Sequence, residues 1–549
     1  MNISRRETAL AALASVLITG LWWVDAMARG AVGALRGDDW VYLRALFRWY
    51  DTGVFAPDFS MAMLIGQVLL AWPVVAAAGH SVVALQALTA LVGAATLTVS
   101  YLVVRAFLPR AGAALSSACL AVGPLYPSLA ISFMSDLYMT GLAMLSLVLG
   151  IRALRSDVGR SLAWMGGSLL ASLAAFSVRE YGLAAGGATT AVLCWSRLQR
   201  RQWRPTLIVA GLGLVTALAA VGLLTWRRSV PGAFVSHNEP WPAAYAASMV
   251  TRLLVTLGLL ILPAAMLLRP GRAALRRRWW LAMLIVAALV GVAMIGATIE
   301  PVALLRNYTA EVPSYSETIP GVAGLIMPRR GYDLMVLGGV VGLLAAVIGI
   351  CCARRRLSGP ALVVLAWALA YGVGLVTIQG LTGNLLFDRY LMPLVVPVAG
   401  LVGHALRGAG ARAWRRLPVV AGLALAGLGG LGLLIADAAA LNDGIKHRVG
   451  VGYRADGYPA DRVDAGYEWF GFYQPGPWGL RQAQPGEPWY WALYPSTTVC
   501  VRLSYDDASI LPGERLVETL TATTLAGREL RYRVTVPATT PAGCPAPPR

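Results

Sequence analysis

Long runs of apolar residues recur along the chain from the N-terminus to about residue 436. Each run holds about 18 to 22 residues, enough for a helix to cross a hydrocarbon core of ~30 Å. This alternation predicts a polytopic α-helical membrane protein with about 13 transmembrane helices. The predicted spans are 8–27, 82–104, 111–131, 137–154, 161–178, 181–196, 206–226, 247–268, 279–298, 332–352, 360–380, 390–406 and 418–436. The first run is too long for the core of a signal peptide, so we interpret it as an uncleaved span.

Arginines are distributed unevenly between the loops that join these runs. They gather in alternate loops, at 105–110, 152–160, 197–204, 269–278, 354–356 and 407–416. Cytoplasmic loops carry such an excess of basic residues. The pattern predicts a multi-pass protein of the cell membrane, with a cytoplasmic N-terminus and an extracytoplasmic C-terminal domain. The same distribution argues that the net charge of +19 does not serve nucleic-acid binding, since the basic residues do not gather on one face or tail.

The segment between the first two predicted spans, residues 28–81, is too long for a simple loop. In DDWVYLRALFRWYD, residues Trp40, Leu43, Phe47 and Tyr50 recur at helical spacing, which predicts an amphipathic helix in the outer interface. Residues 61–79 are apolar enough to span the membrane, but a span there would place the later arginine clusters outside. We therefore predict outer-loop interfacial or re-entrant helices at about 38–79.

Composition changes at about residue 437, where long apolar runs stop and short alternating segments such as VCVRLSY and LRYRVTV begin. This change predicts a transmembrane domain over 1–436 and a small, mainly-β extracytoplasmic domain over 437–549 with a disordered tail. Cys500 and Cys544 are the cysteines of this polar region, and an oxidising location favours a disulfide between them. The aromatic cluster at 465–494 is either the core of this domain together with a membrane-facing aromatic belt, or a stacking surface for a sugar acceptor.

Several ionisable residues fall at the predicted outer ends of spans, where charged groups are costly and are therefore functional candidates. They are Asp38 and Asp39, Asp136, Arg179 with Glu180, and Arg389. The acids could instead cap helices, and the arginines could extend to the membrane interface. Acids and arginines beside a lipid-facing bundle suggest one chemistry. A carboxylate can deprotonate an acceptor hydroxyl, and arginines can hold a leaving phosphate. A lipid that carries a phosphate and a sugar would fit both the carboxylate and the arginines as a substrate.

Four segments resemble motifs of the lipid-dependent glycosyltransferases with the GT-C fold, the family of protein O-mannosyltransferases and aminoarabinose transferases (glycosyltransferase family 39-like). The segments are RGDDWVYLRALFRWYDTGVF, LYPSLAISFMSDLYMTGLAMLSLVLGIRAL, FSVREYGLAAGG and FDRYLMPLVVP, and they occur in the family's order within residues 1–406. The sequence departs from the family where Asp39 replaces the usual Glu, where Arg179 replaces a frequent Lys, and where APDFSMAML replaces a His-Pro-Pro or Lys-Pro-Pro element.

The resemblance implies a role for each matching residue. Asp38 would be the general base, with Asp39 and Asp136 as further catalytic residues. Arg389 and Arg179 would bind the donor phosphate. The residues expected to position donor or acceptor are Tyr42, Glu180 and Tyr390.

The function predicted is therefore transfer of a sugar from a polyprenyl-phosphate donor to an envelope glycan, lipid or protein acceptor on the outer face of the membrane. The partners would be that donor, membrane lipid and the acceptor, with no nucleic acid and no cofactor; the sequence leaves metal dependence open. The four histidines are scattered, so a histidine metal site is not expected. Two alternatives are a transporter or lipid flippase, which would be expected to show internal repeats, and a non-catalytic scaffold.

Overall fold

The structure is a computed structural model that describes residues 3–57, 62–231, 239–266, 272–298, 303–309, 329–351, 357–405, 417–475, 479, 487–494, 497–504 and 510–545. The predicted arginine clusters at 354–356 and 407–416 lie outside the described residues.

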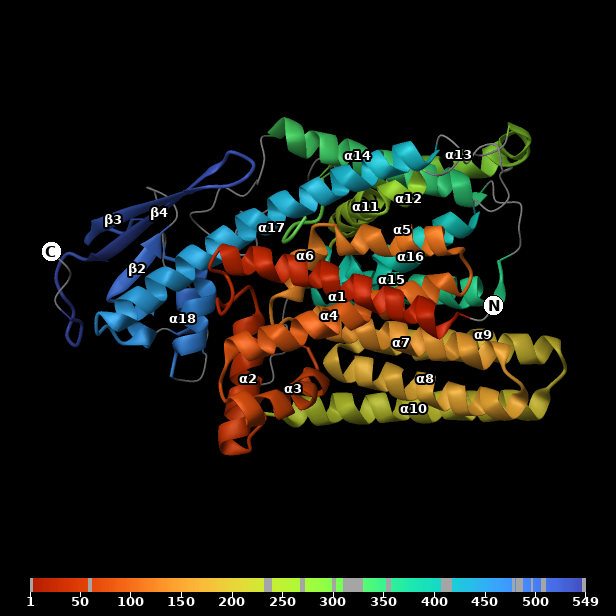
Figure 1. Ribbon diagram of the computed structural model, residues 1–549, viewed down its shortest axis with the longest axis horizontal. Helices are drawn as coiled ribbons and strands as arrows, with labels where there is room; N and C mark the ends of the chain where they lie inside the picture. The colour runs from red at the N-terminus through yellow and green to blue at the C-terminus, as the bar shows by residue number, and fades with distance from the viewer. Residues whose placement is uncertain are drawn as a thin grey trace.

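Most of the chain forms a bundle of long helices that run side by side, with a small sheet at one end (Figure 1). The helices of the bundle are α1 (Arg5–Ala28), α4 (Val82–Arg105), α5 (Arg110–Ala121), α6 (Leu125–Ala130), α7 (Ser135–Arg155), α8 (Val158–Val178), α9 (Leu183–Gln199), α10 (Trp203–Ser229), α11 (Ala243–Leu260), α12 (Leu262–Ala265), α13 (Arg272–Gly296), α14 (Arg329–Cys351), α15 (Gly359–Thr382), α16 (Met392–Ala405) and α17 (Leu417–Ala455). Within the described part of the chain, nine helices are long and apolar enough to cross a membrane. The protein is thus a multi-pass helical membrane protein.

The predicted span 279–298 lies on α13, which has 25 residues. Three other predicted spans correspond to shorter helices. Residues 111–131 form two short helices, α5 and α6, because Pro124 has no backbone N–H to continue the hydrogen-bond ladder. The prediction for 181–196 corresponds to α9, with 17 residues, and that for 390–406 to α16, with 14. Periodicity alone could not separate these shorter apolar helices from full spans.

Two helices between α1 and α4 lie at the sheet end of the bundle. Helix α2 (Asp39–Thr52) lies across that end (Figure 1), and it stops at Gly53, whose φ of +70° suits glycine. Helix α3 (Ile65–Ala78) has 14 residues. Such a helix is about 21 Å long, shorter than a hydrocarbon core of ~30 Å. Its length agrees with the predicted re-entrant or interfacial helix and differs from that of a full span.

Helix α17 runs for 39 residues from the bundle to the sheet, through the domain boundary predicted at residue 437 (Figure 1). The polar residues that follow position 436 suggested the end of a span. In the structure Asp437 and Asp443 are buried and form ion pairs, with Arg29 at 2.6 Å and with Arg36 at 3.3 Å. Because these buried carboxylates are paired with arginines, the helix continues where composition predicted a boundary.

The C-terminal part contains a four-stranded mixed sheet with the strand order β1-β2-β4-β3. Its strands are β1 (Val463–Asp464), β2 (Val501–Ser504), β3 (Glu514–Thr523) and β4 (Glu529–Pro537). Strand β1 pairs parallel to β2, and the other neighbours are antiparallel, with an irregularity between Leu516 and Glu518. The predicted disulfide between Cys500 and Cys544 is present and ties the start of the predicted tail to the sheet.

The aromatic cluster predicted at 465–494 packs inward. It includes helix α18 (Tyr467–Tyr473) and the short helix η6 (Trp489–Leu493). Tyr467, Phe470 and Tyr490 are buried and belong to the same apolar core as α2, α4 and α7. This packing agrees with the interpretation of the cluster as core. It also places a segment from the end of the chain against helix α2, which lies near its start.

Candidate functional site

Asp38 immediately precedes α2 and forms an ion pair with Arg389. Arg389 lies in the short helix η2 (Asp388–Leu391), which leads into α16, and its Nη2 donates to Asp38 Oδ2 at 2.6 Å. The Arg389 side chain is 5% exposed, whereas that of Asp38 is 34% exposed. Asp38 is the N-cap residue of α2, but its side chain makes no capping hydrogen bond to the helix.

A second acid–arginine pair lies next to the first. Arg179, at the end of α8, lies 3.7 Å from Asp136 Oδ2, and its Nε donates to Ser135 Oγ at 2.6 Å. Its Nη2 donates to the Tyr42 hydroxyl of α2 at 3.3 Å. Burial raises the pKa of Tyr42, so its hydroxyl stays protonated.

Tyr390 joins the two pairs. Its ring centroid lies 5.1 Å from the guanidinium carbon of Arg179 and 5.5 Å from that of Arg389, within the range of cation–π attraction. The Tyr371 hydroxyl of α15 donates to the Tyr390 carbonyl at 2.8 Å. Six of the eight residues predicted for the site therefore come together, from α2, α7, α8 and η2: Asp38, Tyr42, Asp136, Arg179, Arg389 and Tyr390.

Asp388 holds η2 and the segment 303–309 together through hydrogen bonds. Its Oδ2 accepts hydrogen bonds from the backbone N–H groups of Tyr308 at 2.7 Å and Thr309 at 2.5 Å, which hold residues 303–309 beside η2. Burial raises the pKa of Asp388 to about 6. Residue 389 is thus held by a fixed backbone on one side and by Asp38 on the other.

The chemistry of this cluster depends on its two acid–arginine pairs, which are mostly shielded from solvent. Arg389 Nε is buried and has no hydrogen-bond partner among the described residues. A guanidinium with an uncommitted donor can bind an additional anion such as a phosphate. Among the described residues, no group of three or more His, Cys, Asp or Glu side chains could hold a metal ion. The cluster therefore combines an accessible carboxylate with shielded cations.

No protein-family model matches the chain, and no curated protein matches it in sequence. Among solved structures it is similar to ArnT from Cupriavidus metallidurans in the apo state, with a TM-score of 0.41 and 16% identity over 95% of this chain and 98% of that one. For ArnT bound to undecaprenyl phosphate the values are 0.42, 17%, 97% and 99%. For the archaeal oligosaccharyltransferase AglB from Archaeoglobus fulgidus, in complex with an inhibitory peptide and a dolichol-phosphate, they are 0.40, 12%, 88% and 61%. For the arabinosyltransferase EmbB from Mycobacterium smegmatis they are 0.30, 14%, 79% and 42%.

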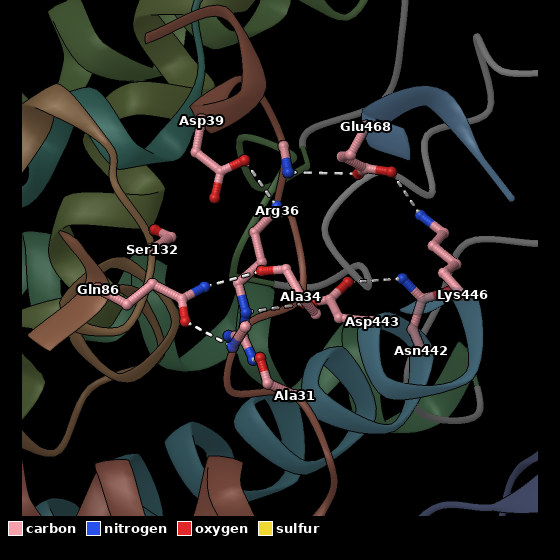
Figure 2. A network of polar contacts seen from close by, with 12 residues as sticks. Ala31, Ala34, Arg36, Asp39, Gln86, Ser132, Asn442, Asp443, Lys446 and Glu468 are labelled. Carbon is pink, nitrogen blue, oxygen red and sulfur yellow. Dashed lines mark hydrogen bonds and ion pairs between the residues drawn. The ribbon is translucent and has the colours of Figure 1, made fainter. Parts of the chain in front are cut away.

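Asp39 faces a different group of residues from Asp38. It is fully buried, and its Oδ1 accepts a hydrogen bond from the backbone N–H of Arg36 at 2.8 Å (Figure 2). Arg36 in turn pairs with Asp443 of α17. Burial raises the pKa of Asp39 well above its ordinary value. Because its contacts are with the loop before α2, the structure gives Asp39 a part in holding that loop.

Glu180 also lies apart from the cluster. It begins the short helix η1 (Glu180–Gly182). Its carboxyl interacts electrostatically with Arg179 and with Arg227 of α10, and it accepts a hydrogen bond from the backbone of Met63. Burial raises the pKa of Glu180. The residue precedes α9 at the turn where it was predicted, but in the described part of the chain no hydrogen bond or ion pair joins it to Asp38 or Asp136.

Tyr467 contacts the cluster from α18, and it was not among the residues predicted for the site. Its hydroxyl donates to Asp38 Oδ1 at 3.3 Å, across a separation of 429 residues. Ser135 and Asp388 were likewise not predicted. Ser135 could have been noticed as the neighbour of Asp136 at the start of α7, whereas Tyr467 stood among many aromatic residues with no feature that distinguished it.

Proposed function

We propose that this protein transfers a sugar from a polyprenyl-phosphate donor to a hydroxyl or amine acceptor on the outer face of the membrane. The observation that carries the proposal is the paired arrangement of Asp38 with Arg389 beside Asp136 with Arg179. The four residues come from four separate segments that resemble the motifs of lipid-dependent glycosyltransferases. One cluster thus holds a base and the cations that a phosphate leaving group requires.

In the proposed reaction the acceptor attacks the anomeric carbon of the donor sugar. Asp38 takes the proton from the acceptor as the new bond to that carbon forms. The bond between the anomeric carbon and the phosphate oxygen breaks, and the polyprenyl phosphate leaves with the electron pair. Arg389 and Arg179 stabilise the negative charge that grows on the phosphate. Attack opposite the leaving group inverts the configuration at the anomeric carbon.

Exposure supports the division of roles between the two acids. Asp38 is about one-third exposed, and substrate can reach its carboxylate, whereas Asp136 is almost fully buried beside Arg179. Asp136 would hold Arg179 in place for the phosphate. Tyr42 and Tyr390 would orient the two arginines through the Tyr42 hydroxyl and the Tyr390 ring.

The proposed orientation places this cluster on the extracytoplasmic side and the N-terminus in the cytoplasm. Thr52, at the end of α2, and Arg200, after α9, are both exposed and lie on opposite sides in this topology. In a variant without other unpaired cysteines, Thr52→Cys should react with a membrane-impermeant maleimide on intact cells, and Arg200→Cys should react only after lysis. Labelling of position 200 alone on intact cells would reverse the orientation.

The function is tested with the purified chain in lipid nanodiscs. The donors would be undecaprenyl phosphates linked to labelled hexose, pentose or amino-pentose, and the acceptor would be a total envelope extract. Transfer of label, with release of one undecaprenyl phosphate for each sugar transferred, would support the proposal. The transporter alternative predicts that a fluorescent polyprenyl-phosphate sugar crosses proteoliposome membranes without loss of its sugar, and that result would contradict the proposal.

A further inference from the structure

The carboxylate of Asp38 is held from two sides by residues that are far apart in the chain. Arg389 donates to Oδ2 at 2.6 Å, and the hydroxyl of Tyr467 donates to Oδ1 at 3.3 Å. Each oxygen therefore has its own donor. Since a carboxylate with one donor can rotate about its last torsion, the second donor fixes the plane of the group.

The C-terminal part of the chain also fixes the position of Tyr467. Gly466, just before α18, has a φ of +106°, and its N–H donates to the buried carboxylate of Asp464 at 3.0 Å. The Tyr467 ring contacts Trp40 of α2 at a centroid distance of 5.5 Å and Trp489 of η6 at 5.1 Å. A phenol packed in this way has little freedom to turn its hydroxyl elsewhere.

The residue after Tyr467 holds the residue before Asp38. Glu468 Oε1 accepts a hydrogen bond from the backbone N–H of Gly37 at 3.2 Å, and its Oε2 lies 3.0 Å from Lys446 Nζ of α17 (Figure 2). Gly37 has a φ of +52°, a conformation that suits glycine. Two successive residues of α18 thus contact two successive residues at the start of α2, one through the backbone and one through the carboxylate.

We propose that the C-terminal part of the chain completes the transferase site, with Tyr467 as a positioning residue for the general base Asp38. The inference rests on the proposed function for the catalytic role of Asp38, but the contact itself does not. Donation from the Tyr467 hydroxyl keeps one orientation of the Asp38 oxygens, so that the acceptor meets a base that is already aligned.

Other charged and titratable groups face Asp38 from the elements around it. They are Arg389 of η2, Tyr42 of α2 and Tyr308 of the segment 303–309, with Asp136 and Arg179 behind them. The substitution Tyr467→Phe leaves all of these in place and keeps the packed ring. Any change at Asp38 in the Tyr467→Phe variant therefore results from the loss of the Tyr467 hydroxyl.

The test compares Tyr467→Phe with Tyr473→Phe, a matched control on the same helix. The Tyr473 ring packs on Trp469, and among the described residues its hydroxyl has no hydrogen-bond partner. For Tyr467→Phe we expect kcat to fall about tenfold, with the donor KM unchanged. Tyr473→Phe should leave both unchanged.

A readout without turnover separates this inference from the proposed function. A water-soluble carbodiimide with glycine ethyl ester modifies accessible carboxyl groups, and mass spectrometry of the peptide that contains Asp38 measures the rate of modification at one pH. Asp38 should be modified faster in Tyr467→Phe, because its carboxylate has lost one of its two donors and can turn away from Arg389, while wild type and Tyr473→Phe should have equal rates. Equal rates for all three proteins would overturn the role of Tyr467. A faster rate in a protein that transfers no sugar from any donor would retain the contact and contradict the transferase.

Discussion

Replacement of Asp38 by asparagine removes the proposed base while it preserves the size of the side chain. The amide cannot accept a proton at neutral pH, and loss of a general base typically costs about 10²- to 10⁴-fold in rate. That loss corresponds to roughly 3–5 kcal/mol of transition-state free energy. The substitution also leaves Arg389 without its charged partner. A disrupted buried pair costs about 3–5 kcal/mol and an exposed one about 0–1. Because Asp38 is one-third exposed and Arg389 is buried, we expect a loss of stability of about 1–3 kcal/mol.

The assay must separate these two effects. Transfer from a labelled undecaprenyl-phosphate sugar in nanodiscs gives the rate, and thermal unfolding followed by tryptophan fluorescence gives the stability. Asp51→Asn is the matched control, since Asp51 lies on the same helix α2, is exposed, and pairs with His80. We expect Asp38→Asn to lose nearly all transfer and to unfold a few degrees lower, yet to bind undecaprenyl phosphate. Near-normal transfer by the folded variant would contradict the role of Asp38 as the base and would assign that role to Asp136.

Three further predictions follow from the same geometry. Arg389→Ala should weaken binding of undecaprenyl phosphate as well as turnover, and unchanged binding by equilibrium titration would remove this residue from the phosphate site. A non-reducing tryptic map should show the peptides of Cys500 and Cys544 linked, and two free thiols would contradict the disulfide. Burial raises the pKa of Asp388 to about 6, above its unfolded value, so its contribution to stability is complete below pH ~4 and is lost as pH rises through 6. Asp388→Asn should therefore flatten the change in thermal unfolding temperature between pH 4 and pH 7, and an unflattened curve would disprove the coupling.

The sequence predicted much of the acid–arginine cluster for a physical reason. In a helix bundle the ends of spans on one side of the membrane lie close together, so ionisable residues at those ends can meet. Asp38, Asp136, Arg179 and Arg389 stood at such ends, and the structure brings them together. The disulfide was predictable in the same way, since the other cysteines lie in or beside apolar runs.

The different orientations of Asp38 and Asp39 could not be predicted from the sequence. Successive residues near a helix start point about 100° apart, so two adjacent carboxylates cannot face the same partner. Which of the two faces Arg389 depends on the backbone of the preceding loop, which Asp39 itself holds through Arg36. The contact of Tyr467 with Asp38 was equally hidden, since nothing in the local sequence specifies which aromatic residue packs onto α2 from 429 residues away.

The unbroken course of α17 sets a constraint on the length of the chain. The helix of 39 residues is about 58 Å long, and it carries Asp443 and Lys446, which contact the loop before α2 and α18. One inserted residue ahead of Asp443 would turn everything beyond it by about 100° and advance it by about 1.5 Å, because an α-helix transmits its rotation along its axis. Tyr467 would then leave Asp38, although no residue of the site had changed. We expect a single alanine inserted in α17 ahead of Asp443 to abolish transfer, whereas the same insertion in the turn at Gly527, between β3 and β4, should be tolerated; transfer retained by the first variant would show that the helix does not set this alignment. The geometry of the site thus depends on the number of residues in α17 as well as on their identity.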